Sequence, residues 1–240
     1  MKRKPLEEKP VVIPSPRRLA LDVLGRVFGD QRTFDEAFAG HTKLELMEPR
    51  DRAFARLLIT TVLRRRGQID EAVDRYLKKA PDPKVRNILR LGAGQLMFLE
   101  TPVHAAVGET VELAGGRASY AQGLINAVLR RLANELAGIA KRQDEARLNV
   151  PEWLWASWTA AYGEETTRAI ALAQLGEPPL DLSVKDVPDL WAKKLEGKVI
   201  AGHDRPRPPG GGVMIESLPG YEQGGWWVQD VAASCRRACW

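Results

Sequence analysis

The chain contains very little cysteine and very little histidine. Of its 240 residues only two are cysteines, both within the last six positions, and only three are histidines, namely His41, His104 and His203. This excludes a disulfide scaffold and a zinc site built from cysteines in the body of the chain. A histidine-built site is disfavoured because the three histidines are scattered, so we expect no bound metal.

Long apolar runs are also missing. No run approaches the roughly 20 residues that a membrane-spanning helix needs. The first ten residues, MKRKPLEEKP, are charged and lack the apolar core of a secretory signal. The sequence therefore predicts a cytoplasmic protein with no membrane partner, preceded by a disordered tail over residues 1–14.

Charge is distributed unevenly along the chain. Residues 1–150 hold 27 Lys and Arg against 19 Asp and Glu, whereas residues 151–240 hold 9 against 12. The net charges of +8 and −3 favour two units, of which the first would bind any polyanion. Charge alone leaves open the alternative that this half is a solvated basic surface with no specific partner.

Apolar residues recur at helical spacing through residues 15–137, which predicts an all-α bundle of about six or seven helices. Ser15-Pro16 and Asp82-Pro83 each suit an N-cap followed by a proline at the first helical position. Ser119, three residues before Gln122, suits a capping box.

A strongly amphipathic helix is predicted after Glu48-Pro49. We expect Arg64, Arg65 and Arg66 to fill its last turn, where positive charge suits the helix dipole, and Gly67 to end it. In the helix after Pro83, Gly92 and Gly94 indicate close packing against another helix.

The composition changes after Val150, where tryptophan becomes frequent. Trp153, Trp155 and Trp158 are interpreted as core or interface residues rather than as a platform for base stacking. The pattern predicts a small α+β piece with too few strands for a complete α/β domain. Its predicted elements are helices over 151–161, 164–175 and 187–195, and strands over 180–184, 198–201 and 213–215.

Arginines are the candidate binding residues. Guanidinium groups bind phosphate oxygens in pairs, so a set of them on helices indicates nucleic-acid contact. The alternative is a set of solvated helix faces and C-terminal caps. The candidates for RNA contact are Arg17, Arg18, Arg50, Arg52, Arg56, Arg64, Arg65 and Arg66.

No set of residues predicts an enzyme active site. The glycines at 210–212 follow proline and are typical of a loop, and His104 near a helix start suits capping or packing. Cys235 and Cys239 lie beside two arginines, which would lower a thiol pKa, but an exposed terminus is the favoured interpretation. We assign no catalytic, cofactor-binding or metal-binding residue.

Six stretches in order resemble the bacterial small-subunit ribosomal RNA cytosine-C5 methyltransferases called RsmB, also Fmu or Sun. The resemblance covers roughly residues 15–234. The stretches are PRDRAFARLLITTVLRRRGQID at 49–70, VRNILRLGAGQLMFLETPVHAAVGETVELA at 85–114, GLINAVLRRLA at 123–133, PEWLWASWTAAYG at 151–163, EPPLDLSVK at 177–185 and LPGYEQGGWWVQDVAAS at 218–234.

The resemblance implies a mainly α fold with a NusB-like RNA-binding helical domain over 15–140. A small, truncated α+β subdomain over 151–228 would follow, ahead of a methyltransferase domain that is missing. Complete relatives would use S-adenosylmethionine and two cysteines, of which one attacks the cytosine ring. Neither Cys235 nor Cys239 lies in those motifs. We therefore expect the chain to bind RNA, with small-subunit ribosomal RNA as partner, but to hold no cofactor and be catalytically inactive.

The last six residues, CRRACW, depart from the family. Family members commonly read Leu-Pro-Ala-Arg-Leu-Leu there, and a GC-rich coding of that peptide read one base out of frame gives Cys-Arg-Arg-Ala-Cys-Trp. We expect residues 229–240 to be a truncated end produced by a one-base frameshift. A natural in-frame stop, with no downstream coding sequence in another frame, would rule this out.

Two other functions compete with this interpretation. A NusB-like module in transcription antitermination would also bind RNA and a protein partner, but it would stop near residue 140, whereas this chain continues. An intact enzyme of another class is disfavoured because no catalytic set of residues is visible.

Overall fold

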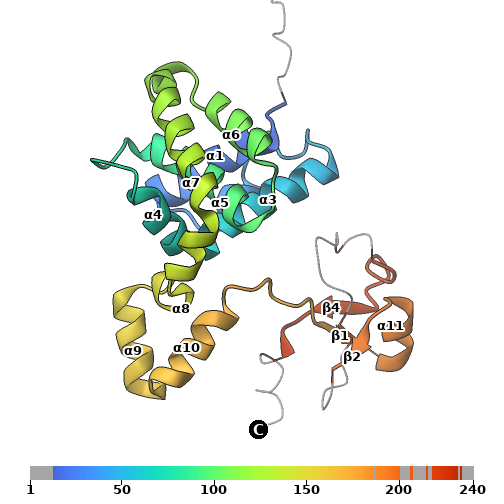
Figure 1. Cartoon of the computed structure of the whole chain (residues 1–240). Coiled ribbons are helices and arrows are strands. Elements are labelled where there is room, and N and C mark those ends of the chain that lie inside the picture. The colour runs from blue at the N-terminus through green and yellow to red at the C-terminus, as the bar shows by residue number, and fades with distance from the viewer. Residues whose placement is uncertain are drawn as a thin grey trace, which may run out of the picture. The chain divides into compact units, whose positions relative to one another are not determined.

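The structure is a computed structural model that describes residues 13–185, 187–200, 206–207, 215, 218–231 and 233. It divides into two compact units, Met1–Leu175 and Gly176–Trp240. The described part of the first unit is helical, and that of the second combines short strands with a helix (Figure 1). The mainly α prediction is confirmed. None of the helices described is long and apolar enough to cross a bilayer.

The first unit begins with a helical bundle arranged around α5. Helices α1, α3, α4, α6 and α7 all contact α5, and every residue of α5 from Asn87 to Leu96 is buried. The elements are α1 (Pro16–Gly29), α2 (Phe34–Ala39), α3 (Pro49–Arg64), α4 (Arg66–Asp74), α5 (Pro83–Phe98), α6 (Val103–Glu112), the 3-10 helix η1 (Gly116–Ala121) and α7 (Gln122–Arg142).

The close packing predicted for the α5 glycines is found at Gly92 but not at Gly94, where a Cβ atom would make only ordinary van der Waals contact. A Cβ atom at Gly92 would lie 2.5 Å from Cδ1 of Leu129 on α7, and one at Gly94 would lie 3.5 Å from Cδ1 of Ile69 on α4. Leu129 and Ile69 are completely buried. A larger residue at Gly92 would push α7 away from the centre of the bundle.

The predicted starts of α1 and α5 are confirmed. The Ser15 side chain accepts a hydrogen bond from the backbone N–H of Arg18 at 3.3 Å, and Asp82 accepts one from Lys84 at 2.9 Å. Proline follows each cap at the first helical position. Both caps satisfy a backbone donor that the helix itself leaves unpaired.

Two predicted helix boundaries are wrong. Ser119 does not begin a capping box, because it already lies inside η1, and α7 starts at Gln122 without a side-chain cap. Gly67 does not end α3 either: that helix ends at Arg64, Arg65 forms the turn, and Gly67 is the second residue of α4. Arg64 alone of the predicted three therefore lies in the last turn of α3.

Three shorter helices complete the first unit, namely α8 (Glu145–Leu148), α9 (Glu152–Tyr162) and α10 (Glu164–Ala173). Arg168 of α10 makes two hydrogen bonds of 2.9 Å to Asp144, which caps α8, and this pairing lowers the pKa of Asp144 from its ordinary value. Trp155 and Trp158 pack against a small buried cluster, as predicted. Trp153 does not, because 72% of it is exposed.

The described part of the second unit contains two pairs of antiparallel strands. Strand β1 (Leu182–Val184) pairs with β4 (Trp226–Val228), and β2 (Lys198–Val199) pairs with β3 (Pro206–Arg207). Helix α11 (Pro188–Lys194) lies between β1 and β2 in sequence. Trp226 is buried with Leu182 and Leu195, and its indole N–H donates to the carbonyl of Pro219 at 2.8 Å. Strand β4 was not predicted from the sequence.

Several predictions fall outside the described residues. They concern residues 1–12 of the predicted tail, the glycines at 210–212, most of the strand over 213–215, and both cysteines, Cys235 and Cys239. The division into units at residue 175 also cuts through 151–228, which the sequence analysis treats as one subdomain.

Candidate nucleic-acid interface

The solvent-facing side of α3 carries four of the eight candidate arginines. At about 3.6 residues per turn, Arg56 and Arg64 lie opposite the buried residues of α3, whereas Arg50 and Arg52 lie at the two margins of the outer side. Arg50 and Arg56 are exposed, and Arg52 and Arg64 are half-buried. The only carboxylate within α3, Asp51, does not lie on this outer side. We call these four side chains the α3 arginine face.

The α3 arginine face is extended rather than concentrated at one point. A helix rises about 1.5 Å per residue, so Arg52 and Arg56 are about 6 Å apart along the axis, and Arg64 lies about 12 Å further on. Within the described residues, none of the four guanidinium groups makes an ion pair. Their charges therefore remain available to an external anion.

Arg56 is held in place by aromatic rings of α2. Its guanidinium lies 5.1 Å from the centre of the Phe34 ring and 5.9 Å from that of Phe38. A guanidinium stacked on a ring keeps the N–H groups at its edge free to bind phosphate oxygens. Thr33 and Glu36 form a reciprocal capping box that fixes the start of α2 and thereby these rings.

Arg17 has intramolecular partners. It is buried, donates to Gln95 at 2.8 Å, and pairs with Glu109 at 2.5 Å. Its guanidinium also lies 5.1 Å from the centre of the Phe54 ring. These contacts join α1 to α3, α5 and α6, so the geometry favours a structural role for Arg17 over the predicted contact with phosphate.

Arg65 and Arg66 are also paired within the chain. Arg65 bridges Glu145 at 2.8 Å and Gln68 at 3.0 Å, and it stacks over Phe98. Arg66 lies 3.6 Å from Asp70, but 57% of its side chain is exposed. Arg66 therefore lies at the surface near other basic residues, whereas Arg65 connects α8 to α4.

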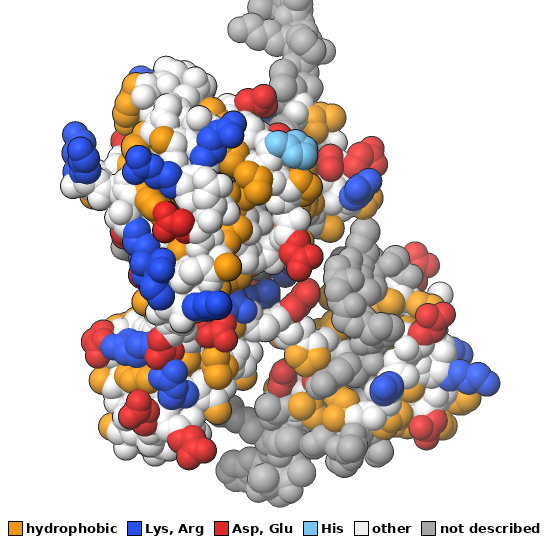
Figure 2. All heavy atoms as spheres, viewed as in Figure 1, with side chains coloured by type: hydrophobic (Ala, Val, Ile, Leu, Met, Phe, Trp, Pro, Cys, Tyr) orange, Lys and Arg blue, Asp and Glu red, His pale blue; other side chains and the backbone are white. Residues whose placement is uncertain are grey.

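Helix α7 carries further basic residues, which are not among the eight arginines predicted from the sequence. Arg130, Arg131, Lys141 and Arg142 are exposed. Figure 2 shows Lys and Arg side chains along the side of the first unit over which α7 runs. Arg18, the remaining candidate, is half-buried on α1.

A basic groove, which was not predicted from the sequence, opens between α1, α4 and α5. Its volume is about 920 Å³, and its lining includes Arg26, Arg66, Lys84, Arg86 and Arg90. These residues come from three helices that are separate in sequence, so their convergence depends on tertiary packing. Only the spacing of Arg86 and Arg90, one helical turn apart, was visible in the sequence.

His41 lies at the same groove and is buried. Burial lowers its pKa from the ordinary value, and the nearby charge of Arg26 lowers it further. Its Nδ1 atom accepts a hydrogen bond from the backbone N–H of Lys43 at 3.3 Å. The lowered pKa favours the neutral form of His41, so the positive charge of the groove comes mainly from its arginines and lysine.

Comparison with known proteins places these elements in a family. The family model described as the NusB family matches residues 14–134, which is half of the chain. The match includes α1 to α6 and more than half of α7, and so it contains both the α3 arginine face and the groove. The chain belongs to the NusB family. The NusB-like fold predicted from the sequence is thereby confirmed.

Curated relatives of this NusB-family chain are named ribosomal RNA small subunit methyltransferase B. The protein of Cronobacter sakazakii is 34% identical over 77% of this chain and 46% of that protein. The protein of Pseudomonas putida is 31% identical over 91% of this chain and 53% of that protein. The chain spans about half the length of these curated relatives. The predicted resemblance to this methyltransferase family is confirmed over most of the chain.

Solved structures also resemble the chain. A crystal structure of PH0851 shares its fold with a TM-score of 0.53 at 14% sequence identity, covering 96% of this chain and 56% of that one. NusB of T. maritima aligns with a TM-score of 0.44 at 26% identity, covering 52% of this chain and 94% of that one.

The described residues do not fit the donor site that the resemblance implies. S-adenosylmethionine sites of this kind form at the carboxyl ends of parallel strands. The strands described here pair only as β1 with β4 and β2 with β3, and both pairs are antiparallel. In the same part of the chain, no group of three or more His, Cys, Asp or Glu side chains is placed to hold a metal ion.

Proposed function

We propose that this NusB-family chain binds RNA through the α3 arginine face, as the RNA-binding portion of a small-subunit ribosomal RNA methyltransferase. The observation that carries the proposal is the outer side of α3, which has two exposed and two half-buried arginines, no carboxylate and no intramolecular ion pair among the described residues. Guanidinium groups spaced along a helix suit the phosphates of an RNA backbone, which they bind largely without regard to sequence.

The names of the curated relatives support ribosomal RNA as the partner. The alignment with the Pseudomonas putida protein covers 91% of this chain, well beyond the NusB match that ends at residue 134. This extent favours the methyltransferase family over a free-standing antitermination module. The proposal places the protein in the cytoplasm with its RNA.

A second part of the proposal is that the 240-residue chain does not transfer a methyl group by itself. It is supported by the misfit between the described residues and a donor site. The chain would then have no cofactor of its own. Methyl transfer to deproteinised small-subunit RNA by the purified chain, lost in Cys235→Ser or Cys239→Ser, would overturn this part without affecting RNA binding.

The binding of RNA is expected to weaken steeply with salt. Each neutralised phosphate contributes about 0.7 to 0.9 to the slope of log affinity against log salt, so four arginine contacts predict a slope of about −3. Titration of the full chain into fluorescently labelled fragments of small-subunit RNA, at several salt concentrations, measures it. Affinity that does not change with salt, or no binding at low salt, would contradict the proposed function.

A further inference from the structure

The groove between α1, α4 and α5 is a second basic site, and it is built from different residues. It is lined by the second half of α1, the start of α4, the segment before α5 and the first turns of α5. Of the residues of the α3 arginine face, none lines it. Its volume of about 920 Å³ is near the upper end of ordinary small-ligand pockets, and it is large enough for several nucleotide-sized groups in succession.

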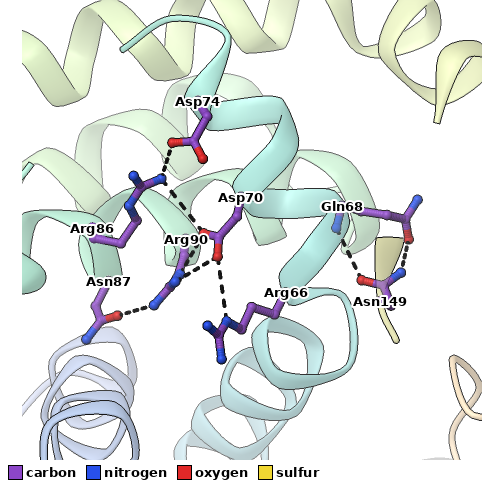
Figure 3. A network of polar contacts seen from close by, with 8 residues as sticks. All are labelled: Arg66, Gln68, Asp70, Asp74, Arg86, Asn87, Arg90 and Asn149. Carbon is purple, nitrogen blue, oxygen red and sulfur yellow. Dashed lines mark hydrogen bonds and ion pairs between the residues drawn. The ribbon is translucent and has the colours of Figure 1, made fainter. Parts of the chain in front are cut away.

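Positive charge exceeds negative charge at this groove. Among the residues that the structure describes, five cationic side chains line it and Asp22 is the only lining carboxylate. Asp70 and Asp74 are not lining residues, but they form ion pairs with lining arginines (Figure 3). Asp70 pairs with Arg66, Arg86 and Arg90, and Asp74 pairs with Arg86. Even when all three carboxylates are counted, two positive charges remain without a matching negative charge. A groove with this excess attracts polyanions.

Two of the guanidinium groups, those of Arg86 and Arg90, are fixed before any ligand arrives. Arg90 makes two hydrogen bonds of 2.7 Å to Asp70 and one of 3.0 Å to Asn87. Arg86 pairs with Asp74, and Asp70 also lies 3.9 Å from Arg86. Binding an anion here costs little side-chain entropy, because these two arginines are already ordered.

An aromatic ring orients two of the groove arginines. The guanidinium of Arg90 lies 4.7 Å from the centre of the Phe28 ring, and that of Arg66 lies 5.1 Å from it. The side chain of Arg66 is 57% exposed, so its guanidinium can reach a ligand. Stacking leaves the edge of the Arg66 guanidinium able to donate to a phosphate oxygen, whereas Arg90, which already donates to Asp70 and Asn87, contributes positive charge to the groove.

We infer that this groove binds a stretch of RNA phosphodiester backbone, as a second contact beside the α3 arginine face. The inference rests on the proposed RNA-binding function. The several converging guanidinium groups suit consecutive phosphates better than a single small anion, which one or two of them would satisfy. A bound backbone would run past the exposed start of α5, where Lys84 supplies a further positive charge.

The experiment uses a glycine at the groove as a place to insert charge. Gly25 lines the groove in the middle of α1, and a Cβ atom added there would have no neighbour within 4 Å. Gly25→Gln therefore adds bulk without disturbing the packing, and Gly25→Glu adds the same bulk with a negative charge. Gly108→Glu, on α6 and equally free of neighbours, is the matched control outside the groove.

RNA affinity of the full chain is measured for all of these variants over a range of salt concentrations. Gly25→Glu is expected to bind at least about fivefold more weakly than Gly25→Gln, with a salt slope smaller by about one, as loss of a phosphate contact requires. Gly108→Glu is expected to stay within about twofold of the unmodified chain. Thermal melting confirms that each variant is folded.

The outcomes separate the two proposals. If the unmodified chain binds RNA with the expected salt dependence but Gly25→Glu and Gly25→Gln bind equally, the groove assignment fails and the proposed function stands. If the unmodified chain binds no RNA, both fail. Poly-glutamate serves as a second probe: a difference between the two variants for poly-glutamate but not for RNA would assign the groove to an acidic polypeptide and overturn the inference.

Discussion

Reversing the charges of Arg52 and Arg56 together is expected to weaken RNA binding on the order of 100-fold at about 0.1 M salt. Arg56 is exposed and Arg52 is half-buried on the outer side of α3, and neither has an ion-pair partner among the described residues. Arg52→Glu and Arg56→Glu remove two phosphate contacts and add two repulsive charges. The salt slope is expected to fall by about two, and most RNAs should be affected alike because backbone contacts carry no sequence information.

A matched double variant distinguishes the effect of losing the α3 site from the effect of changing the total charge. Lys193→Glu with Lys198→Glu changes the net charge by the same amount on exposed residues of the second unit. This pair is expected to alter affinity by no more than about threefold, since these lysines do not belong to the proposed site and salt screens exposed charges that make no direct contact with the RNA. Arg56 also stacks on Phe34 and Phe38, so thermal melting must show that the α3 variant is folded. Equal losses in the two double variants would contradict a localised site.

Replacing Gly67 with alanine is expected to destabilise the first unit by about 3 kcal/mol, which is large for a single methyl group. A Cβ atom at Gly67 would lie 1.7 Å from the carbonyl oxygen of Leu148 and 2.4 Å from its carbonyl carbon. Backbone atoms cannot move aside as a flexible side chain can. The segment containing α8 would therefore have to leave α4.

The same substitution would break polar contacts beside Gly67. The backbone N–H of Gln68 donates to the Asn149 side chain at 3.2 Å, and Asn149 donates back to Gln68 at 2.9 Å (Figure 3). Hydrogen exchange is expected to increase over α8 to α10 in Gly67→Ala while α5 stays protected. Gly108→Ala, at a helical position free of neighbours, is the control and should be neutral or slightly stabilising. Unchanged exchange over α8 to α10 would show that this close approach is not essential.

Local signals in the sequence were enough to predict much of the bundle. Ser15-Pro16 and Asp82-Pro83 mark helix starts because a cap and a proline act on their own backbone neighbours. Gly67 was misinterpreted because a glycine after a run of arginines is typical of a helix end, whereas its role here depends on Leu148, which is 81 residues away. Strand β4 was missed because its partner, β1, is also distant in sequence.

At the candidate site, too, the roles that depend on contacts between distant residues could not be predicted from the sequence. The spacing of Arg52 and Arg56, one helical turn apart, indicates a shared side of α3, because helical periodicity is a local property. Nothing local shows that Arg17 is buried against Gln95 and Glu109, since those partners belong to α5 and α6. The basic groove escaped prediction for this reason too: its residues converge only when α1, α4 and α5 have packed.

Ultraviolet crosslinking of the full chain to small-subunit RNA containing 4-thiouridine, with the crosslinked peptides identified by mass spectrometry, tests the central claim most directly. We expect crosslinks to peptides of α3 between Pro49 and Arg64, competed away by salt and lost in the Arg52 and Arg56 double variant. Crosslinks confined to residues 176–240, or a pattern that the double variant leaves unchanged, would contradict it.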